Sequence, residues 1–413
     1  MISKHLEGKM KEVLPLTRAF IGRFLSAAGV IALSIILARQ LSLSEAGIFF
    51  GMFISLMGLS IAFQFGTPLI LLRKVAGLHD SPTEADGVFS RTISNLAAVC
   101  VIVTILWVGF IALIGAGGKP QHLILLNILP TTLMGPISAY LKAKNCPGWG
   151  GFWEVGVLSL IAFMFVLVLR PTNAIEAWLV FSAACWIGMI IAVLHAGPRH
   201  LRALTRPSLD ISLLLEGRFL WGMSVLSYVA LWGGVAIAKW FLEADATAVL
   251  NALFRTLAPI QFLILTIDFY MAPKFAAASV ATFRALYTKA RVLCAVLVIP
   301  YALITLTMPS AFLTLMYGQP YGAFSTELRI VIIATIIQIA IGPSGILLNM
   351  NGQDRITLYC MGLKTVLYLT LSLLLVVDYG IMGIIVSLSI AIIVQAFLQY
   401  YIVARIYFRA AVN

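Results

Sequence analysis

The chain has 413 residues, of which 61% are hydrophobic and only 11% are charged, and its formal net charge is +12. A soluble domain is about 45–50% apolar and about 25% charged, so this composition excludes an ordinary soluble fold. We therefore expect an all-α polytopic membrane protein. The basic excess, which in a soluble protein would point to nucleic acid, is here attributed to topology and to contact with anionic lipid headgroups.

Twelve apolar runs are long enough to cross a bilayer, which takes about 20 mostly apolar residues. They lie at about 18–40, 46–72, 91–114, 122–144, 152–170, 175–195, 218–242, 246–270, 290–314, 325–350, 355–377 and 380–404. The first run is too long for a cleaved signal peptide, and further spans follow it. The sequence thus predicts twelve transmembrane helices.

Basic residues are unevenly distributed between the two sides of these spans. Of the 28 Lys and Arg residues, twenty fall on the side of the N-terminus, four fall on the opposite side and four fall inside spans. Cytoplasmic loops carry the excess of Lys and Arg. The distribution predicts that both the N-terminus and the C-terminus are cytoplasmic.

The longest loop, at about 196–217, separates six predicted spans from six. We expect two six-helix bundles, 1–207 and 208–413. Gly135-Pro136 and Gly342-Pro343 lie at the same depth in the fourth span of each half. This match favours two parallel repeats, as in many transporters. Coincidence is the alternative, because Gly and Pro are common in membrane helices.

No motif for catalysis or cofactor binding is present in the sequence. The five cysteines form no CxxC pair, and the five histidines show no metal-ligand spacing. A P-loop, a dinucleotide-binding glycine motif and a GxSxG motif are also absent. We expect no metal, no cofactor and no catalytic residue, and any transport is expected not to be driven directly by ATP.

The run "ATAVLNALFRTLAPIQFLILTID" ends at Asp268, and Arg255 is the single charge between Asp245 and Asp268. It lies about 15 Å deep at 1.5 Å per residue, where a charge costs roughly 2.5–3.5 kcal/mol. Asn251 and Pro259 share its helix face, and Pro259 cannot donate to the carbonyl of Arg255, which predicts a kink. This combination favours a cation that lines an internal cavity. The alternative is a buried ion pair with an acid on another helix.

Three further cations fall inside predicted spans. Lys364 lies near mid-depth with Tyr368 one turn away, whereas Arg23 and Arg329 lie close enough to span ends to reach the membrane surface. Gln64 and Gln338 also lie within spans, where such residues form interhelical hydrogen bonds more often than ligand contacts. The predicted interior thus has cations and few deep acids. This sign suits an anionic substrate, and Arg matches the geometry of phosphate.

The stretch "RFLSAAGVIALSIILARQLSLSEAGIFFGMFISLMGLSIAFQFGTPLILLRKVA" (23–76) resembles the opening of bacterial polysaccharide flippases, and "GPSGILLNMNGQDR" (342–355) resembles a later segment of them. These O-antigen and repeat-unit flippases belong to the multidrug/oligosaccharidyl-lipid/polysaccharide (MOP) exporter superfamily. The resemblance implies a MOP/MATE-like fold around a V-shaped cavity. It also implies an undecaprenyl-pyrophosphate-linked oligosaccharide as substrate, moved from the cytoplasmic to the outer leaflet of the bacterial inner membrane by alternating access. Membrane lipids and other polysaccharide-assembly proteins would be its partners.

Related peptidoglycan-precursor flippases have cavity arginines on helices 1 and 8, where Arg23 and Arg255 fall in this chain. They commonly have fourteen spans, so twelve spans favour the repeat-unit flippases. The predicted substrate site for the pyrophosphate comprises Arg255, Arg23, Lys364 and Asn251, and further cavity or hinge positions are Pro259, Gln64, Gln338 and Tyr368.

Three other functions remain open from the sequence. A drug or cation antiporter of the same fold would need a deep Asp or Glu. A membrane enzyme that processes glycans would need carboxylates or histidine on a sizeable outer loop, and the predicted outer loops are short. A non-transporting scaffold of the same shape is excluded by no feature of the sequence.

Overall fold

The computed structural model describes residues 2–78, 81–113, 120–144, 146–276 and 280–408. Within these ranges the chain is helical and contains no strand. It divides into two compact units, Met1–Tyr228 (unit 1) and Val229–Asn413 (unit 2), and each is described by itself. The two six-helix bundles 1–207 and 208–413 remain a prediction.

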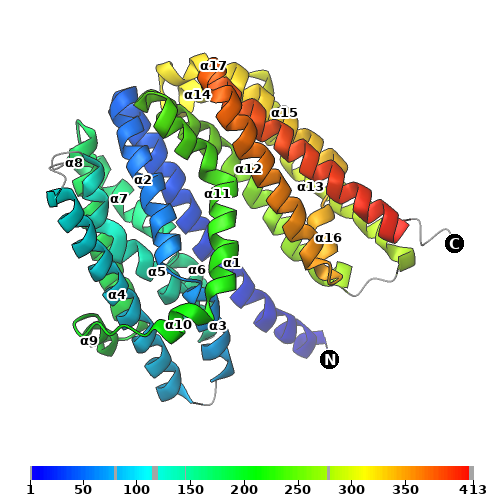
Figure 1. Ribbon diagram of the computed structural model, residues 1–413. Helices are drawn as coiled ribbons and strands as arrows, with labels where there is room; N and C mark the ends of the chain where they lie inside the picture. The colour runs from blue at the N-terminus through cyan, green and yellow to red at the C-terminus, as the bar shows by residue number, and fades with distance from the viewer. Residues whose placement is uncertain (1, 79–80, 114–119, 145, 277–279, 409–413) are drawn as a thin grey trace. The chain divides into compact units, whose positions relative to one another are not determined.

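Unit 1 contains ten α-helices, two short 3-10 helices and the first part of an eleventh α-helix (Figure 1). Their bounds are α1 Ile2–Gln40, α2 Leu43–Phe63, α3 Thr67–Gly77, α4 Pro82–Leu113, η1 Pro120–Ile124, α5 Leu125–Ala143, α6 Pro147–Phe152, α7 Gly156–Leu169, α8 Ala174–Ala196, η2 Pro198–His200, α9 Leu201–Leu204, α10 Ile211–Glu216 and α11 Arg218–Phe241. Helix α1 packs on α6 and α7, and α5 lies among α2, α3, α4, α6 and α8.

Helix α5 continues through two prolines, Pro130 and Pro136. A proline inside a helix leaves the carbonyl four residues earlier without its backbone donor. Side chains from other helices replace both donors: Trp186 Nε1 donates to the carbonyl oxygen of Leu126 at 2.9 Å, and Gln64 Nε2 donates to that of Thr132 at 3.1 Å. Such replacement is how membrane helices tolerate proline.

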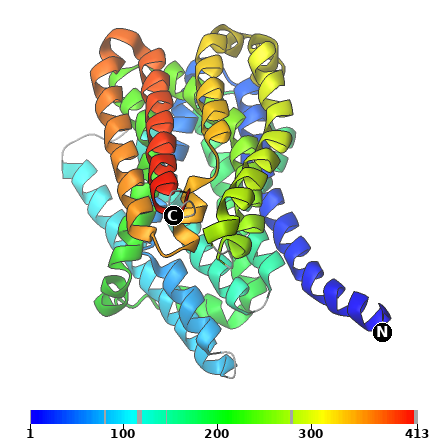
Figure 2. The ribbon, with the colours of Figure 1, turned by 90° about the vertical axis from the view of Figure 1, so that its right-hand side faces the viewer.

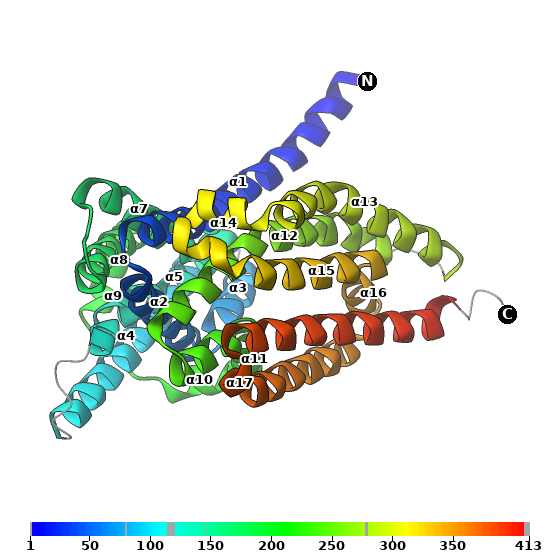
Figure 3. The same ribbon diagram turned by 90° about the horizontal axis from the view of Figure 1, so that it is seen from above.

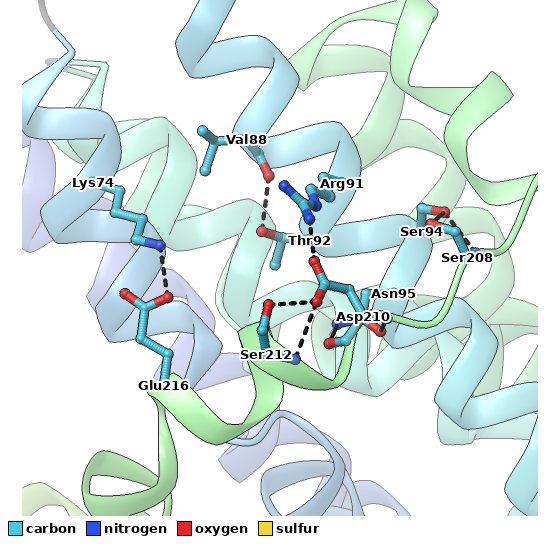
Figure 4. Close-up of polar contacts among 10 residues, drawn as sticks. All are labelled: Lys74, Val88, Arg91, Thr92, Ser94, Asn95, Ser208, Asp210, Ser212 and Glu216. Atoms are coloured by element: carbon cyan, nitrogen blue, oxygen red, sulfur yellow. Dashed lines mark hydrogen bonds and ion pairs between the residues drawn. The ribbon is translucent and has the colours of Figure 1, made fainter.

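The connection between α8 and α11 is ordered and docks on unit 1 (Figure 4). Asn95 of α4 exchanges two hydrogen bonds of 3.0 Å with the backbone of Asp210, and the Asp210 carboxylate pairs with Arg91. Lys74 of α3 pairs with Glu216 of α10 at 2.7 Å. We refer to residues 197–217 as the docked linker. The sequence predicted a loop here, and the structure shows that hydrogen bonds and ion pairs hold this loop against α3 and α4.

Unit 2 contains the rest of α11 and the helices that follow it. Their bounds are α12 Ala244–Ala276, α13 Val280–Thr307, α14 Pro309–Tyr317, η3 Gln319–Phe324, α15 Ser325–Ile341, α16 Ser344–Met350, α17 Asp354–Val403 and the short π-helix η4 Ala404–Phe408. Helix α15 packs against both α13 and α17, and these helices lie alongside one another when viewed from above (Figure 3).

Glycines in the left-handed region shape unit 2 at two points. Gly380 has φ 54° and interrupts α17, whose two arms lie side by side as the orange and red helices of Figure 2. Gly342 has φ 114° and ends α15, so that α16 begins at Ser344. Gly135-Pro136, its predicted counterpart in a repeat, lies inside the continuous α5 instead. The two dipeptides therefore differ in local structure.

Ten helices in the described part of the chain are long and apolar enough to cross a membrane. One of them, Arg355–Tyr407, contains the break at Gly380, and Gly156–Leu169 is a shorter apolar helix. The protein is thus a multi-pass membrane protein. The count of twelve spans and the cytoplasmic location of both termini remain predictions.

Candidate functional site

A pocket of about 440 Å³ lies within unit 1, between the end of α2, the start of α3, the second half of α5 and the start of α7. We refer to it as the unit 1 pocket. Its walls are mostly apolar, and its polar lining includes Ser60, Gln64, Ser138, Lys142 and Glu154. The sequence pointed to Gln64 among these residues, and the structure places it in the pocket wall.

Glu154 lies in the turn between α6 and α7 and joins two basic side chains. It accepts a hydrogen bond of 2.8 Å from Lys142 Nζ, and its carboxylate lies 3.7 Å from Arg23 Nε. Arg23 is 49% exposed at its side chain. The sequence predicted for Arg23 either a cavity role or contact with the membrane surface, and the structure adds an ion pair with Glu154. Its role in binding a pyrophosphate remains a prediction.

Gln64 and Ser60 lie one turn apart at the end of α2. Gln64 uses one amide hydrogen on the Thr132 carbonyl and lies directly over Gly135, where a Cβ would approach Gln64 Nε2 to 2.7 Å. Ser60 is only 2% exposed, and its hydroxyl has no hydrogen-bond partner among the described residues. The pocket wall therefore holds an unused buried hydroxyl beside an amide.

Unit 2 contains three of the four predicted pyrophosphate-binding residues. Arg255 is half-buried on α12, with its guanidinium 4.9 Å from the ring centre of Trp232. Asn251, one turn earlier, is 1% exposed, and within the described residues neither atom of its amide group has a partner. Helix α12 runs without interruption through Pro259.

Tyrosines surround the same turns of α12. Tyr301 of α13 donates a hydrogen bond of 2.9 Å to the Thr256 carbonyl, and the Thr256 hydroxyl lies 3.4 Å from that of Tyr317 at the end of α14. The guanidinium of Arg255 thus lies in a neighbourhood of aromatic rings and hydroxyl groups. The sequence gave no sign of these partners, because they come from helices distant along the chain.

The remaining predicted residues of unit 2 lie on other helices. Lys364 is half-buried on α17, and it takes part in none of the described ion pairs. Tyr368 is fully buried and packs against Gly234 of α11, and Gln338 is half-buried near the end of α15. Arg255 and Asn251 therefore share one helix face, whereas Lys364 lies on a separate helix.

A second charged cluster of unit 1 escaped the sequence analysis. The carboxylate of Asp86 on α4, which is 7% exposed, pairs with Arg199 of the docked linker, with Lys144 at 2.7 Å and with the hydroxyl of Tyr140. His200 lies beside it, fully buried, with Nδ1 2.8 Å from the Ser90 hydroxyl.

Burial, with the positive charges of Arg199 and Lys144, lowers the pKa of His200 to about 4. The His200 imidazole is therefore neutral at pH 7. No described group of three or more His, Cys, Asp or Glu side chains is arranged to hold a metal ion. This cluster fastens the linker to α4.

Solved structures share this fold over nearly the whole chain. The lipid II flippase MurJ in an inward closed conformation aligns with a TM-score of 0.69 and 13% identity, over 97% of this chain and 90% of that one. A MOP superfamily transporter from Pyrococcus furiosus, described by the reverse polarity of its binding pocket, aligns with a TM-score of 0.62 and 14% identity, over 97% and 96%. MATE in complex with MaL6 aligns with a TM-score of 0.61 and 14% identity, over 96% of each chain.

Sequence comparison adds no closer relative. No known protein family matches the chain, and no curated protein matches it. At 13–14% identity the structural likeness shows the fold and leaves the substrate open. The polysaccharide flippase family therefore remains a prediction, and the protein is a multi-pass membrane protein with the fold of MOP superfamily transporters.

Proposed function

We propose that this protein is a transporter rather than an enzyme, and that it flips undecaprenyl-pyrophosphate-linked oligosaccharide repeat units from the cytoplasmic to the outer leaflet of a bacterial inner membrane. The pyrophosphate would bind Arg255, with Lys364 and Asn251 as further contacts. The MurJ likeness supports a lipid-linked substrate, because that neighbour is a lipid II flippase.

The observation that best supports this proposal is that α12 and α17 of unit 2 each have a cation well inside the helix. Arg255 is eleven residues beyond the start of α12 at Ala244, and Lys364 is ten residues beyond the start of α17 at Asp354. The acids Asp245 and Asp268 lie nearer the ends of α12. A membrane interior of this sign attracts an anion.

The physical need for such cations is large. Transfer of an ionised group into a medium of low dielectric costs roughly tens of kcal/mol without compensation. Fixed cations replace part of the hydration that a pyrophosphate loses, while the polyprenyl tail stays in lipid. Arg255 is suited to this role because its planar guanidinium forms two parallel hydrogen bonds with phosphate oxygens.

The test is leaflet accessibility of an undecaprenyl-pyrophosphate-linked glycan in proteoliposomes. We expect the wild type to expose the glycan, Arg255→Ala to abolish exposure and Arg255→Lys to retain part of it. Arg329→Ala is the matched control, because Arg329 is exposed near the start of α15. Normal flipping by Arg255→Ala would overturn the site, and no flipping of any glycan by the wild type would overturn the function.

A second candidate function, a proton-coupled drug or cation antiporter, is favoured by Asp268. One carboxyl oxygen of this half-buried residue of α12 is enclosed and has no hydrogen-bond partner among the described residues. Acidic residues inside membrane spans form the proton relays of pumps and transporters. Uptake of ethidium driven by a pH gradient, lost in Asp268→Asn and kept in Arg255→Ala, would establish this alternative.

A further inference from the structure

The unit 1 pocket has polar groups of both signs, which a purely cationic site does not need. Lys142 donates, Glu154 accepts, and the two are joined at 2.8 Å in the pocket wall. Its volume of about 440 Å³ falls within the roughly 300–1,000 Å³ of ligand pockets. The site lies wholly within unit 1, so its chemistry can be considered apart from Arg255.

Ser60 supplies the first sign of a ligand. Its side chain is 2% exposed and lines the pocket, yet its hydroxyl has no hydrogen-bond partner among the described residues. Burying a hydroxyl without a partner costs about 1–3 kcal/mol. Most helical serines and threonines avoid this cost by donating to a carbonyl one turn earlier, as Ser55 does on the same helix. A ligand that bonds to Ser60 recovers this free energy.

Gln64 supplies the second sign. A glutamine amide has two donor hydrogens and an acceptor oxygen. One hydrogen is used on the Thr132 carbonyl, which leaves the second hydrogen and the oxygen for other partners. Gly135 sets the position of this amide, because a Cβ there would press on Gln64 Nε2 at 2.7 Å.

The mixture of donors and acceptors selects among ligand classes. An anion in the pocket would be repelled by Glu154, and a cation would be repelled by Lys142 and Arg23. A hydroxyl group both donates and accepts, so a ligand rich in hydroxyls can bond to Glu154, Lys142, Gln64 and Ser60 without any repulsion. Apolar wall residues such as Leu69 and Leu72 suit the C–H faces of a sugar ring.

We propose that the unit 1 pocket binds carbohydrate, and that it holds one or two sugar residues of the lipid-linked substrate. This inference rests on the proposed function for the identity of that substrate. The pocket would then distinguish one glycan from another, which the pyrophosphate that all such lipids share cannot do.

The test is ligand-induced thermal stabilisation of the purified full-length protein. The probes are free oligosaccharides containing hexose, N-acetylhexosamine and deoxyhexose units, with inorganic pyrophosphate and tetraphenylphosphonium as the anionic and cationic comparisons. We expect stabilisation by at least one oligosaccharide. Ser60→Ala should weaken that affinity about fivefold and Glu154→Gln about tenfold, as expected for one neutral and one charge-assisted hydrogen bond.

Ser60→Leu should abolish binding by filling the pocket, and Gly135→Ala should weaken it by displacing Gln64. Ser55→Ala is the matched control, because it removes a hydroxyl from the same helix outside the pocket. Glu154→Gln is the most discriminating variant. It removes a charge-assisted hydrogen bond and so weakens the binding of a sugar in this pocket, whereas it would strengthen the binding of an anion there. It also keeps the size of the side chain, so the shape of the pocket is preserved.

Three results would overturn the inference. These are no stabilisation by any oligosaccharide, oligosaccharide binding that Ser60→Leu leaves unchanged, or pyrophosphate binding that Glu154→Gln strengthens. Because free sugars bind without being moved, the test is separate from the flipping assay. Sugar binding without flipping would reject the proposed function alone, and flipping with an unchanged Ser60→Leu affinity would reject the pocket alone.

Discussion

In unit 1 the half-buried basic residues meet carboxylates, whereas in unit 2 Arg255 meets the ring of Trp232. Six ion pairs join described residues of unit 1, including those of Glu154 with Arg23 and with Lys142. A carboxylate neutralises the charge of its partner, whereas the face of an aromatic ring attracts a cation through its quadrupole. The difference indicates that the ion pairs of unit 1 join its helices and its docked linker, whereas the ring of Trp232 is one contact of the Arg255 guanidinium.

The largest expected loss of stability follows from removing Asp86, whose carboxylate is shared by several side chains of unit 1. Asp86→Ala would remove the buried carboxylate that Lys144, Arg199 and the Tyr140 hydroxyl share. A hydrogen bond to a charged group contributes about 1.5–3 kcal/mol, so the loss of all three should cost about 3 kcal/mol or more. The measurement is the free energy of unfolding in detergent. Glu84→Ala, an exposed residue in the first turn of the same helix, is the control and should cost under about 1 kcal/mol. A loss for Asp86→Ala as small as the control's would contradict the framework role.

The next effect concerns pH and the docked linker. The pKa of His200 is about 4 in the folded protein, against about 6.5 in the unfolded chain. As pH falls, the unfolded chain binds the proton first, so stability is complete above pH 6.5 and is lost towards pH 4. The loss is about 2 kcal/mol at pH 5. Denaturation at pH 7 and pH 5 should show this slope in the wild type, and His200→Phe should flatten it; an equal slope in both would refute the assignment.

A smaller effect tests the aromatic partner of unit 2. Trp232→Leu should remove a cation–π contact worth about 0.5–2 kcal/mol, and Trp232→Phe should retain part of it. Trp240→Leu is the matched control, because Trp240 lies on the same helix and is 85% exposed. The comparison uses unfolding free energies. If both tryptophan-to-leucine changes have the same effect, the ring of Trp232 does not stabilise Arg255.

The smallest effect is expected at the exposed end of the linker. Lys74 and Glu216 are 40% and 44% exposed, and an exposed pair contributes about 0–1 kcal/mol. Lys74→Ala should therefore change the unfolding free energy little, and high salt should remove the difference. A loss as large as that of Asp86→Ala would show that exposure does not separate the two kinds of pair.

The positions of several helices follow from the sequence, because the length of an apolar run is a local property. The runs predicted at 46–72 and 325–350 are each divided between two helices instead. The span predicted at 246–270 corresponds to α12, Ala244–Ala276, and the span predicted at 175–195 corresponds to α8, Ala174–Ala196. The break between the last two predicted spans falls at Gly380. The MOP-like fold was expected from two stretches of modest specificity and agrees with the solved neighbours.

The partners of the candidate residues could not be predicted. Glu154 pairs with Arg23, a contact between residues distant along the chain that only the tertiary fold reveals. The aromatic surroundings of Arg255 come from α11, α13 and α14. Ser60 gave no signal at all, because an unused hydroxyl is visible only when the packing around it is known. Gly135-Pro136 looked equivalent to Gly342-Pro343, although only the second pair ends a helix.

The bond from Gln64 to the Thr132 carbonyl makes the acceptability of one substitution depend on another. While Pro136 is present, replacing Gln64 leaves the Thr132 carbonyl without a hydrogen-bond donor. Once Pro136 is replaced by Ala, the backbone N–H of residue 136 can donate to the Thr132 carbonyl, and the side chain at position 64 is no longer needed as its donor. The two positions are therefore epistatic, and a lineage can vary residue 64 safely only after it has lost the proline.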